Sequence, residues 1–364
     1  MKSGNKVLFA FVALMLFVSL ACAGSATPTP TAIPTNTAVN TAVPPSPTAV
    51  KAAPMELSTE LYTHPSGAFT FYPPVGWEIK DSDIDVLVYE PETGITFYVA
   101  VTNFGLPLDA ASYEAYVNAT ETYYYTSMEG YEQLDYGVGT AKDVYVVEKT
   151  YLYDGKTQYA KSIYNQFGQV NFVFEVIGQD SIVKENPEYL ALFDKFFEKL
   201  EVAADAVLTR PVYELTWKFV GPDNSMTIDV PVGWTYSLDD RTTYSDAVME
   251  SLTSPDGAAL IENISVVDGN TYTMGNAGEM ALFLLNERYS NGGGDVRVSN
   301  IQTLSDGSEY WTWKSTKGGY SGVTNFELRN GGTQVLLLSF VSYDSTLEIY
   351  APLFDRVFGT YTIP

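Results

Sequence analysis

The sequence contains the same turn twice, once in each half. Residues 71–77 read Phe-Tyr-Pro-Pro-Val-Gly-Trp, and residues 228–234 read Ile-Asp-Val-Pro-Val-Gly-Trp. After each copy come apolar strand patterns, a helix pattern, further strand patterns and a closing Phe-Asp-Lys or Phe-Asp-Arg segment, in the same order. Internal repetition determines the architecture of a chain, so it has to be identified before single elements are assigned. The sequence predicts two tandem copies of one domain, over 55–205 and 211–364.

Alternating and apolar runs predict the strands of each copy. In the first copy they fall at 69–71, 86–89, 95–101, 143–152, 158–164 and 170–177. The last three are expected to correspond to 296–303, 309–314 and 323–328 of the second copy. That copy also has a strand pattern at 260–266 and an additional run at 334–341, whose pairing the sequence does not fix.

Two helices are expected in each copy. Asp109 is a candidate N-cap for the first helix of the first copy, and Asn276 with Glu279 three residues later forms a candidate capping box in the second. An apolar stripe over 187–200 predicts the closing helix of the first copy. In the second copy Pro352 is expected to kink the closing helix or to delay its start, because proline cannot donate a helical hydrogen bond.

The charge of the chain restricts its partners. Acidic residues outnumber basic ones by 44 to 20, for a formal net charge of −24 over 364 residues. Such a surface repels phosphate backbones, so the sequence predicts no nucleic-acid partner, whereas basic proteins, cations and neutral glycans remain compatible. The chain also has 27 Tyr, 19 Phe and 5 Trp, residues that favour the half-buried surface of strands.

The N-terminus has the pattern of an export signal. Two lysines in the first six residues precede an apolar run over 7–21, which is shorter than the roughly 20 residues that a spanning helix needs. Residues 1–21 are therefore predicted to be a signal peptide. Cys22, the only cysteine, ends this run, and the segment resembles the lipobox of bacterial lipoproteins. That resemblance implies a lipid anchor on Cys22 in the membrane. Cleavage at Ala-Cys-Ala, which would release a secreted protein, is the alternative.

The next segment is rich in Thr and Pro. Residues 22–54 contain the predicted lipidation site and then a linker with no acidic residue. Proline fixes the backbone and withholds a donor, and the remaining residues offer too little apolar surface for a core. The sequence predicts a disordered spacer that holds the folded part away from a membrane. An extracytoplasmic location follows from the leader and this spacer together.

The repeated elements resemble the PsbP-like family. A strand with Pro-x-Gly-Trp, a helix, antiparallel strands and a closing aromatic helix occur over about 57–202 and again over 212–363. The resemblance implies an α+β fold in each copy, with an antiparallel sheet covered by helices on both faces. It transfers no functional residue, because the matching positions are structural. Many bacterial domains of this family have no known function.

Few residues suit catalysis or metal binding. His64 is the only histidine and is expected in a loop, and its pairing with Cys22 or a zinc site is excluded by count and position. Asp81, Asp83, Asp85 and Glu92 have the spacing of a calcium loop, but Val86 stands where such a loop needs glycine. The favoured interpretation is a solvated acidic connection, with calcium as the alternative and no other cofactor expected.

Two aromatic groups are candidates for binding a glycan or a partner. Trp311 and Trp313 alternate along one face of a predicted strand, and Tyr123 and Tyr124 end a predicted helix. Packing in the core is the favoured interpretation of the tryptophans, and solvent exposure would favour binding instead. Trp77 and Trp234 follow the repeated turns and are expected to be structural.

No catalytic residues are predicted. The hypothesis from the sequence is a non-enzymatic lipoprotein of the cell envelope that displays two domains to an envelope protein or a wall component. The first alternative is a hydrolase of wall polymers with an acidic pair between the copies. The second is a calcium-binding or glycan-binding module.

Overall fold

The computed structural model describes residues 55–139, 144–222, 226–239 and 247–362. The predicted signal peptide, Cys22 and the Thr/Pro-rich linker lie outside these residues. Residues 55–208 form the first half of the folded part, and residues 212–362 form the second half. Each half is built on one antiparallel sheet of seven strands.

The sheet of the first half has the order β3-β4-β5-β9-β8-β7-β6. Its strands are β3 (Glu78–Asp81), β4 (Asp85–Tyr89), β5 (Thr96–Asn103), β6 (Glu132–Val138), β7 (Val144–Tyr153), β8 (Lys156–Phe167) and β9 (Val170–Gln179). A small sheet of β1 (Tyr62–Thr63), β2 (Phe69–Phe71) and β10 (Glu201–Val202) lies beside it. The helices are α2 (Ala110–Glu121), the π-helix η1 (Thr122–Thr126), α3 (Asp180–Glu185), α4 (Glu188–Glu198) and α5 (Ala204–Leu208).

The sheet of the second half has the order β13-β14-β15-β19-β18-β17-β16, which repeats the order of the first. Its strands are β13 (Thr235–Asp239), β14 (Ala247–Thr253), β15 (Ala259–Val266), β16 (Val296–Thr303), β17 (Glu309–Ser315), β18 (Tyr320–Arg329) and β19 (Gln334–Tyr343). A ribbon of β11 (Thr216–Val220) and β12 (Thr227–Pro231) precedes it. The helices are α6 (Met274–Tyr289) and α7 (Leu347–Phe358), with the short 3-10 turn η3 (Asn330–Gly332).

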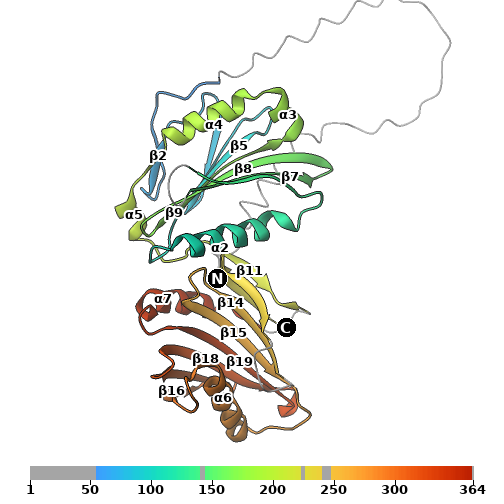
Figure 1. The fold of residues 1–364 in the computed structure, drawn as a ribbon, viewed down its shortest axis with the longest axis vertical. Coiled ribbons are helices and arrows are strands. Elements are labelled where there is room, and N and C mark those ends of the chain that lie inside the picture. Colours follow the sequence, from blue (N-terminus) through green and yellow to red (C-terminus); the bar gives the residue numbers. More distant parts are fainter. Residues whose placement is uncertain (1–54, 140–143, 223–225, 240–246, 363–364) are drawn as a thin grey trace, which may run out of the picture.

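The expected α+β class with helix-covered sheets is wrong, because the fold is mostly β. Of the described residues, 45% lie in strands and 24% in helices. Each seven-stranded sheet has a helix of 11 to 16 residues packed on either face, which is too narrow to cover seven strands. The edge strands β6 and β16 are accordingly exposed along most of their length. Figure 1 shows α2 and α4 beside the sheet of the first half, and α6 and α7 beside the sheet of the second.

Alternation along the strands divides the first half into two cores. One face of the sheet, with Phe97 and Phe174, packs against α4 through Phe193 and Phe196. The other face packs against α2, where Tyr113 and Val117 are fully buried. Asp109 caps α2 as expected, because its carboxylate accepts a hydrogen bond from the Ser112 amide.

The second half repeats this arrangement. The helix α6 buries Ala277, Ala281, Leu284 and Leu285 against one face of the sheet. The helix α7 buries Leu353 and other apolar residues against the opposite face. Both faces of each sheet therefore contribute to a core, but only near its middle strands.

Several element predictions need correction. The strand β6 was absent from the prediction, because this exposed edge strand carries no apolar alternation. The run at 143–152 was expected to correspond to the run at 296–303. The order of strands in the two sheets shows instead that β7 corresponds to β17, and that β16 corresponds to β6. The unassigned run at 334–341 is β19, the central strand between β15 and β18.

Two helix ends also differ from the sequence prediction. The N-cap of α6 is Thr273, and the expected cap Asn276 is the third residue of the resulting capping box. The helix thus begins one turn earlier than predicted. The helix α7 continues through Pro352, so the proline does not delay its start. Buried residues on both sides of the proline, Tyr350 and Leu353, hold that helix against the sheet.

The two halves share one continuous core. Phe104 of the first half stacks on Tyr213 of the second, with ring centroids 5.1 Å apart. The Tyr213 amide donates to the carbonyl oxygen of Asn103 at 2.8 Å, and Arg210, in the connection between the halves, donates to the carbonyl oxygen of Asp83 at 2.6 Å. Figure 1 shows α2 at the junction, above β11, and α6 at the far end of the second half. The folded part is therefore a single body built from two similar halves.

Candidate functional site

A buried lysine lies at the centre of the first half. Lys149 of β7 has no exposed surface. Its Nζ donates to Glu121 Oε1 at 2.6 Å and to Ser162 Oγ at 2.5 Å, and it lies 3.2 Å from Glu175 Oε1. The same ammonium is 3.7 Å from the centre of the Tyr125 ring. A lysine without water needs such partners, because an isolated buried charge is very costly.

Tyrosine hydroxyls complete this group. Tyr125 donates to Glu175 Oε1 at 2.6 Å, and Tyr164 donates to Glu121 Oε1 at 2.6 Å. The second carboxyl oxygen of Glu121, Oε2, is buried without a hydrogen-bond partner. We call this set the Lys149 cluster; it consists of Glu121, Tyr125, Lys149, Ser162, Tyr164 and Glu175.

Burial raises the pKa of the Glu121 carboxyl above its usual range, and Lys149 and Tyr164 only partly oppose this effect. Burial and the neighbouring carboxylates raise the pKa values of the Tyr125 and Tyr164 hydroxyls well above 10, so both remain donors at neutral pH. The upward shift favours the neutral form of the Glu121 carboxyl, which a dry interior also favours.

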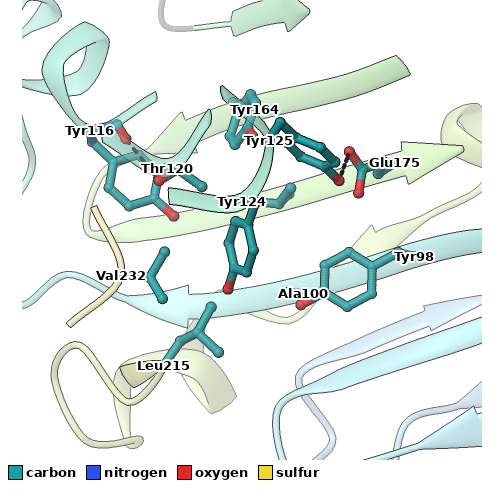
Figure 2. A pocket seen from close by; sticks show the side chains of 11 residues that line it. Tyr98, Ala100, Tyr116, Thr120, Tyr124, Tyr125, Tyr164, Glu175, Leu215 and Val232 are labelled. Carbon is teal, nitrogen blue, oxygen red and sulfur yellow. Dashed lines mark hydrogen bonds between the residues drawn. The ribbon is translucent and has the colours of Figure 1, made fainter. Parts of the chain in front are cut away.

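A small cavity separates this cluster from the second half. It has a volume of about 20 Å³, and its lining includes Tyr98, Tyr124 and Glu175 from the first half. Leu215 and Val232 of the second half close it from the other side, as Figure 2 shows. Such a space holds about one water molecule. Glu175 is the one carboxylate among the residues that line this cavity.

The second half places other residues at the positions of the cluster. In the first sheet Tyr98 pairs with Glu175, and Glu175 with Ser162. In the second sheet the same strands pair Glu262 with Ser339, and Ser339 with Thr324.

The neighbouring strands extend this correspondence. Val147 of β7 pairs with Ser162, and at the corresponding place Trp311 of β17 pairs with Thr324. Lys149 lies two residues after Val147, and Trp313 lies two residues after Trp311. Lys149 therefore corresponds to Trp313. Trp313 donates through Nε1 to Thr324 Oγ1 at 2.9 Å. A neutral hydrogen-bonded chain thus replaces the ionic one.

An open groove lies on the outer side of α6. It has a volume of about 520 Å³ and is lined by Glu279, Leu282, Phe283, Asn286, Glu287, Gly293 and Gly294, which together we call the α6 groove. Phe283 is 48% exposed, a large fraction for an aromatic side chain. Its neighbours Glu279 and Glu287 lie one turn before and one turn after it on the same helix face. The groove therefore presents an aromatic ring between two acidic residues.

The structure buries both candidate tryptophans. Trp311 is 5% exposed and Trp313 is 1% exposed, and both lie in the core under α6. Trp311 also packs edge-on against Phe326, with centroids 5.1 Å apart. Neither indole offers an open face to a glycan in this structure.

The candidate tyrosines lie at the junction of the halves. Tyr123 packs on Trp217 of β11, with ring centroids 4.3 Å apart. Tyr124 points into the small cavity toward Leu215 and Val232 (Figure 2). Their packing therefore joins the two halves, and they form no open platform.

The structure separates the acidic residues proposed for calcium. Asp81 accepts a hydrogen bond from the Tyr62 hydroxyl at 2.8 Å, and Asp85 is buried and accepts from Tyr98 at 3.2 Å. Asp83 and Glu92 are exposed. Throughout the described ranges no group of three or more His, Cys, Asp or Glu side chains is placed to hold a metal ion.

His64 lies in the loop between β1 and β2, as expected, and its side chain is buried. Its Nδ1 lies 2.6 Å from Ser66 Oγ, its Nε2 lies 3.2 Å from the carbonyl oxygen of Asp85, and its ring stacks on Phe69. Burial lowers the pKa of His64, and the hydrogen bond to the Asp85 carbonyl opposes that shift. The imidazole therefore joins the small sheet of the first half to β4.

Lys149, Glu121 and Glu175 were not among the residues predicted from the sequence. The sequence did contain an indication for the lysine. Lys149 alternates with Val147 and Tyr151, so the three side chains lie on the same face of the strand, and that face is otherwise apolar. A charged residue on such a face is either buried or lies on an edge strand. The two glutamates had no signal, since 44 acids give no basis for choosing two.

Comparisons with known proteins find similar structures but no family model. No family model matches the chain, and none of the curated proteins is similar to it. Among solved structures, the chain is similar to cyanobacterial PsbP from Synechocystis sp., with 14% identity, a TM-score of 0.31, and 43% of this chain and 98% of that chain covered. PsbP is the protein after which the family suggested by the sequence is named.

Two further similar structures come from Pseudomonas aeruginosa. One is a protein of unknown function, with 9% identity, a TM-score of 0.26, and 36% of this chain and 90% of that chain covered. The other is the type VI secretion immunity protein TplEi, with 10% identity, a TM-score of 0.20, and 79% of this chain and 97% of that chain covered. Within the part of the chain that the structure describes, no helix has the length and apolarity needed to cross a membrane.

Proposed function

We propose that this protein is an extracytoplasmic lipoprotein that binds a basic segment of an envelope protein through its second half. The N-terminal sequence supports the location, because a positive start and an apolar run lead to Cys22. The Thr/Pro-rich segment supports display away from the membrane. About 30 residues in polyproline II conformation would reach up to roughly 90 Å.

The two halves act in this proposal as tandem copies of one PsbP-like domain. Equal strand order and equal register across corresponding strands support a duplication. The shared core at the junction holds the copies as one body, so the α6 groove has a fixed place at the end far from α2 (Figure 1). A lipid on Cys22 would anchor the chain, and the second half would meet the partner.

The α6 groove is the observation that carries the proposal. Glu279, Phe283 and Glu287 follow one another at four-residue spacing along one helix face. A lysine or arginine of a partner can lay its methylene groups on the Phe283 ring and its charge beside the carboxylates. Gly293 and Gly294, both with positive φ and no side chain, form the opposite wall. A partner backbone can approach that wall closely.

Charge complementarity selects a basic partner. The chain carries a formal net charge of −24, which attracts basic segments over distances of about 10 Å at ordinary salt concentration. An acidic or phosphate-rich partner would be repelled by the same field. Wall polymers without positive charge would gain nothing from Glu279 and Glu287. The proposed partner is therefore a basic, partly apolar segment of a protein.

Titration calorimetry with a synthetic peptide of alternating lysine and leucine tests the proposal on the full chain. We expect binding, and we expect Glu279→Lys combined with Glu287→Lys to weaken it by at least about tenfold, or 1.4 kcal/mol. Phe283→Ala should weaken it as well, because the aromatic contact is lost. Higher salt concentration should reduce the affinity.

A matched variant controls for charge alone. Glu348→Lys changes an exposed acid at the start of α7, in the same half but outside the groove. It should leave the affinity nearly unchanged. Equal losses for Glu348→Lys and for Glu279→Lys alone, each of which changes the net charge by two, would mean that only the overall field attracts the peptide. Absence of binding to the unmodified chain would refute the proposal.

A further inference from the structure

The Lys149 cluster takes no part in the proposed function, and its composition needs a reason. A lysine and two glutamates are buried together, and taking each ion out of water is costly. The corresponding positions of the second half hold Trp313, Thr324 and Ser339 as a neutral chain. These three positions are thus satisfied without ions, and the neighbouring buried carboxylate of that half, Glu262 of β15, is paired with Arg288 of α6.

We propose that Lys149 and Glu121 become joined by an amide bond between Nζ of Lys149 and the side-chain carboxyl carbon of Glu121, with release of one water. The bond would link β7 covalently to the end of α2. It is independent of the function proposed above, because the α6 groove lies in the other half.

The geometry places the reacting groups together. Nζ of Lys149 lies 2.6 Å from Oε1 of Glu121, and the hydroxyl of Tyr164 donates to that same oxygen at 2.6 Å. A donor on this oxygen stabilises the negative charge that develops there when an amine attacks the carboxyl carbon. The other oxygen of Glu121, Oε2, has no partner and is free to leave.

Glu175 is positioned to accept the proton of the ammonium. Its Oε1 lies 3.2 Å from Nζ of Lys149 and accepts hydrogen bonds from Ser162 and Tyr125 at 2.5 and 2.6 Å. An amine attacks only after it has lost its positive charge. Glu175 is therefore the general base of the step.

The step balances in atoms and protons. The reactants are the Lys149 ammonium, the Glu175 carboxylate and the Glu121 carboxylic acid. One ammonium proton passes to Glu175, the C–N bond forms, and a second proton leaves nitrogen with the hydroxyl of Glu121 as water. The products are a secondary amide with one N–H, a water molecule and protonated Glu175. No oxidant, reductant or outside group is needed.

The surroundings favour the product. In water an amine and an acid remain as ions, whereas a dry site penalises both charges and favours the neutral amide. The upward shift of the Glu121 pKa favours the acid form of its carboxyl, which is the form that reacts. The cavity of about 20 Å³ beside Glu175 has room for the released water.

Tryptic mapping of the denatured full chain tests the bond directly. Trypsin cuts after a free lysine but not after an acylated one. Trypsin places the two glutamates in different peptides, because Glu121 lies in peptide 81–142 and Glu175 in peptide 162–184. We expect peptide 81–142 joined to 143–156, uncut after Lys149, with the mass of the pair lower by one water. We expect the separate peptide 143–149 to be nearly absent.

Two lysine variants control the assignment. Lys149→Arg keeps the charge but supplies no nucleophile, because arginine is not deprotonated in proteins. The mass of the intact variant should exceed the mass of the chain without substitutions by the difference between arginine and lysine plus one water, because the variant forms no amide bond. Lys161→Arg changes a partly exposed lysine on the other face of the sheet and should show the residue difference alone. Glu175→Gln should lower the joined fraction.

The contradicting results are equally definite. Full recovery of the free peptide 143–149 from the unmodified chain would overturn the proposal, whatever the variants do. A joint between 143–156 and 162–184 would overturn it too, because Glu175 would then be the acylating residue.

Discussion

Lys149 enters the core of the first half at the position where Trp313 enters the core of the second. Both residues lie on the strand next to one edge of a seven-stranded sheet, with the same order and register around them. Around Lys149 two carboxylates and three hydroxyl groups gather. Around Trp313 a threonine and a serine form a neutral chain. One scaffold thus tolerates two kinds of interior, and chemistry can be added to one copy without changing the fold.

The helices on the corresponding faces differ in a complementary way. The helix α2 lies at the junction, where Tyr116 of the first half packs over Gly233 of the second. The helix α6 lies at the free end and carries the α6 groove (Figure 1). The first half therefore provides the internal cluster and the contact between copies. The second half provides the open surface.

Removal of the buried lysine should have the largest effect on stability. Lys149→Met removes the proposed amide bond and leaves the carboxyl groups of Glu121 and Glu175 buried without a cation, and we expect a loss of about 3–5 kcal/mol in the free energy of unfolding. Urea unfolding followed by tryptophan fluorescence measures it. Adding Glu121→Leu and Glu175→Leu should recover part of the loss, because the uncompensated charges are gone. Lys161→Met, on the partly exposed face, should cost far less, and equal losses would show that the cluster has no special role.

The next largest effect should come from the junction. In Gly233→Ala the new methyl group would overlap the Tyr116 ring, and the backbone has φ of 88°, so we expect a loss of about 2–4 kcal/mol. Gly257→Ala is the matched control, with φ of 66° and open space around the added carbon. It should cost about 1 kcal/mol. Similar midpoints of thermal unfolding for both variants would contradict the close packing of the halves.

The interior of the second half should be less sensitive. Trp313→Phe removes the hydrogen bond from Nε1 to Thr324 and leaves a small space, for an expected loss of about 1–3 kcal/mol. Trp311→Phe serves as the comparison, since its Nε1 donates to Glu309 in a partly exposed position. Chemical unfolding of both variants should rank Trp313 as the more costly of the two. The reverse order would contradict the equivalence of Trp313 with Lys149.

The smallest expected effect is a pH dependence from His64. Burial holds its pKa below the usual 6.5, so on acidification the unfolded chain takes up a proton before the folded chain does. Stability from this group is complete above pH 6.5 and is lost as the pH falls toward the folded-state pKa. His64→Gln should remove this loss of stability in that range. Denaturant midpoints between about pH 5 and 7.5 measure it, and parallel curves for the two proteins would contradict it.

The repeat allowed much of the scaffold to be predicted from the sequence. Apolar alternation located β5, β7, β8 and β9, and the cap at Asp109 located the start of α2. The same method missed β6, because an edge strand exposes both faces and carries no alternation. The same omission led to a wrong match for β16. Because β6 was missing from the first copy, β16 was matched with β7, the next strand in the chain, and each later strand was also matched one position too far along.

The site could not be predicted in the same way. Glu121, Lys149 and Glu175 come from a helix and two strands, and only the packing of α2 on the sheet brings them together. The α6 groove depends on which face of α6 the sheet covers and on the glycine loop beside it. Tyr123 and Tyr124 were candidates for an open platform, but the second half packs against them. Contacts between copies are not encoded in the periodicity of either copy.

Amide hydrogen exchange with and without the lysine and leucine peptide tests the division of roles between the halves most directly. The account predicts added protection in α6 and in the glycine loop over 279–294, and none in α2 of the first half. It also predicts that Glu279→Lys combined with Glu287→Lys abolishes this protection. Protection centred on the first half, or spread evenly over the acidic surface, would contradict the account.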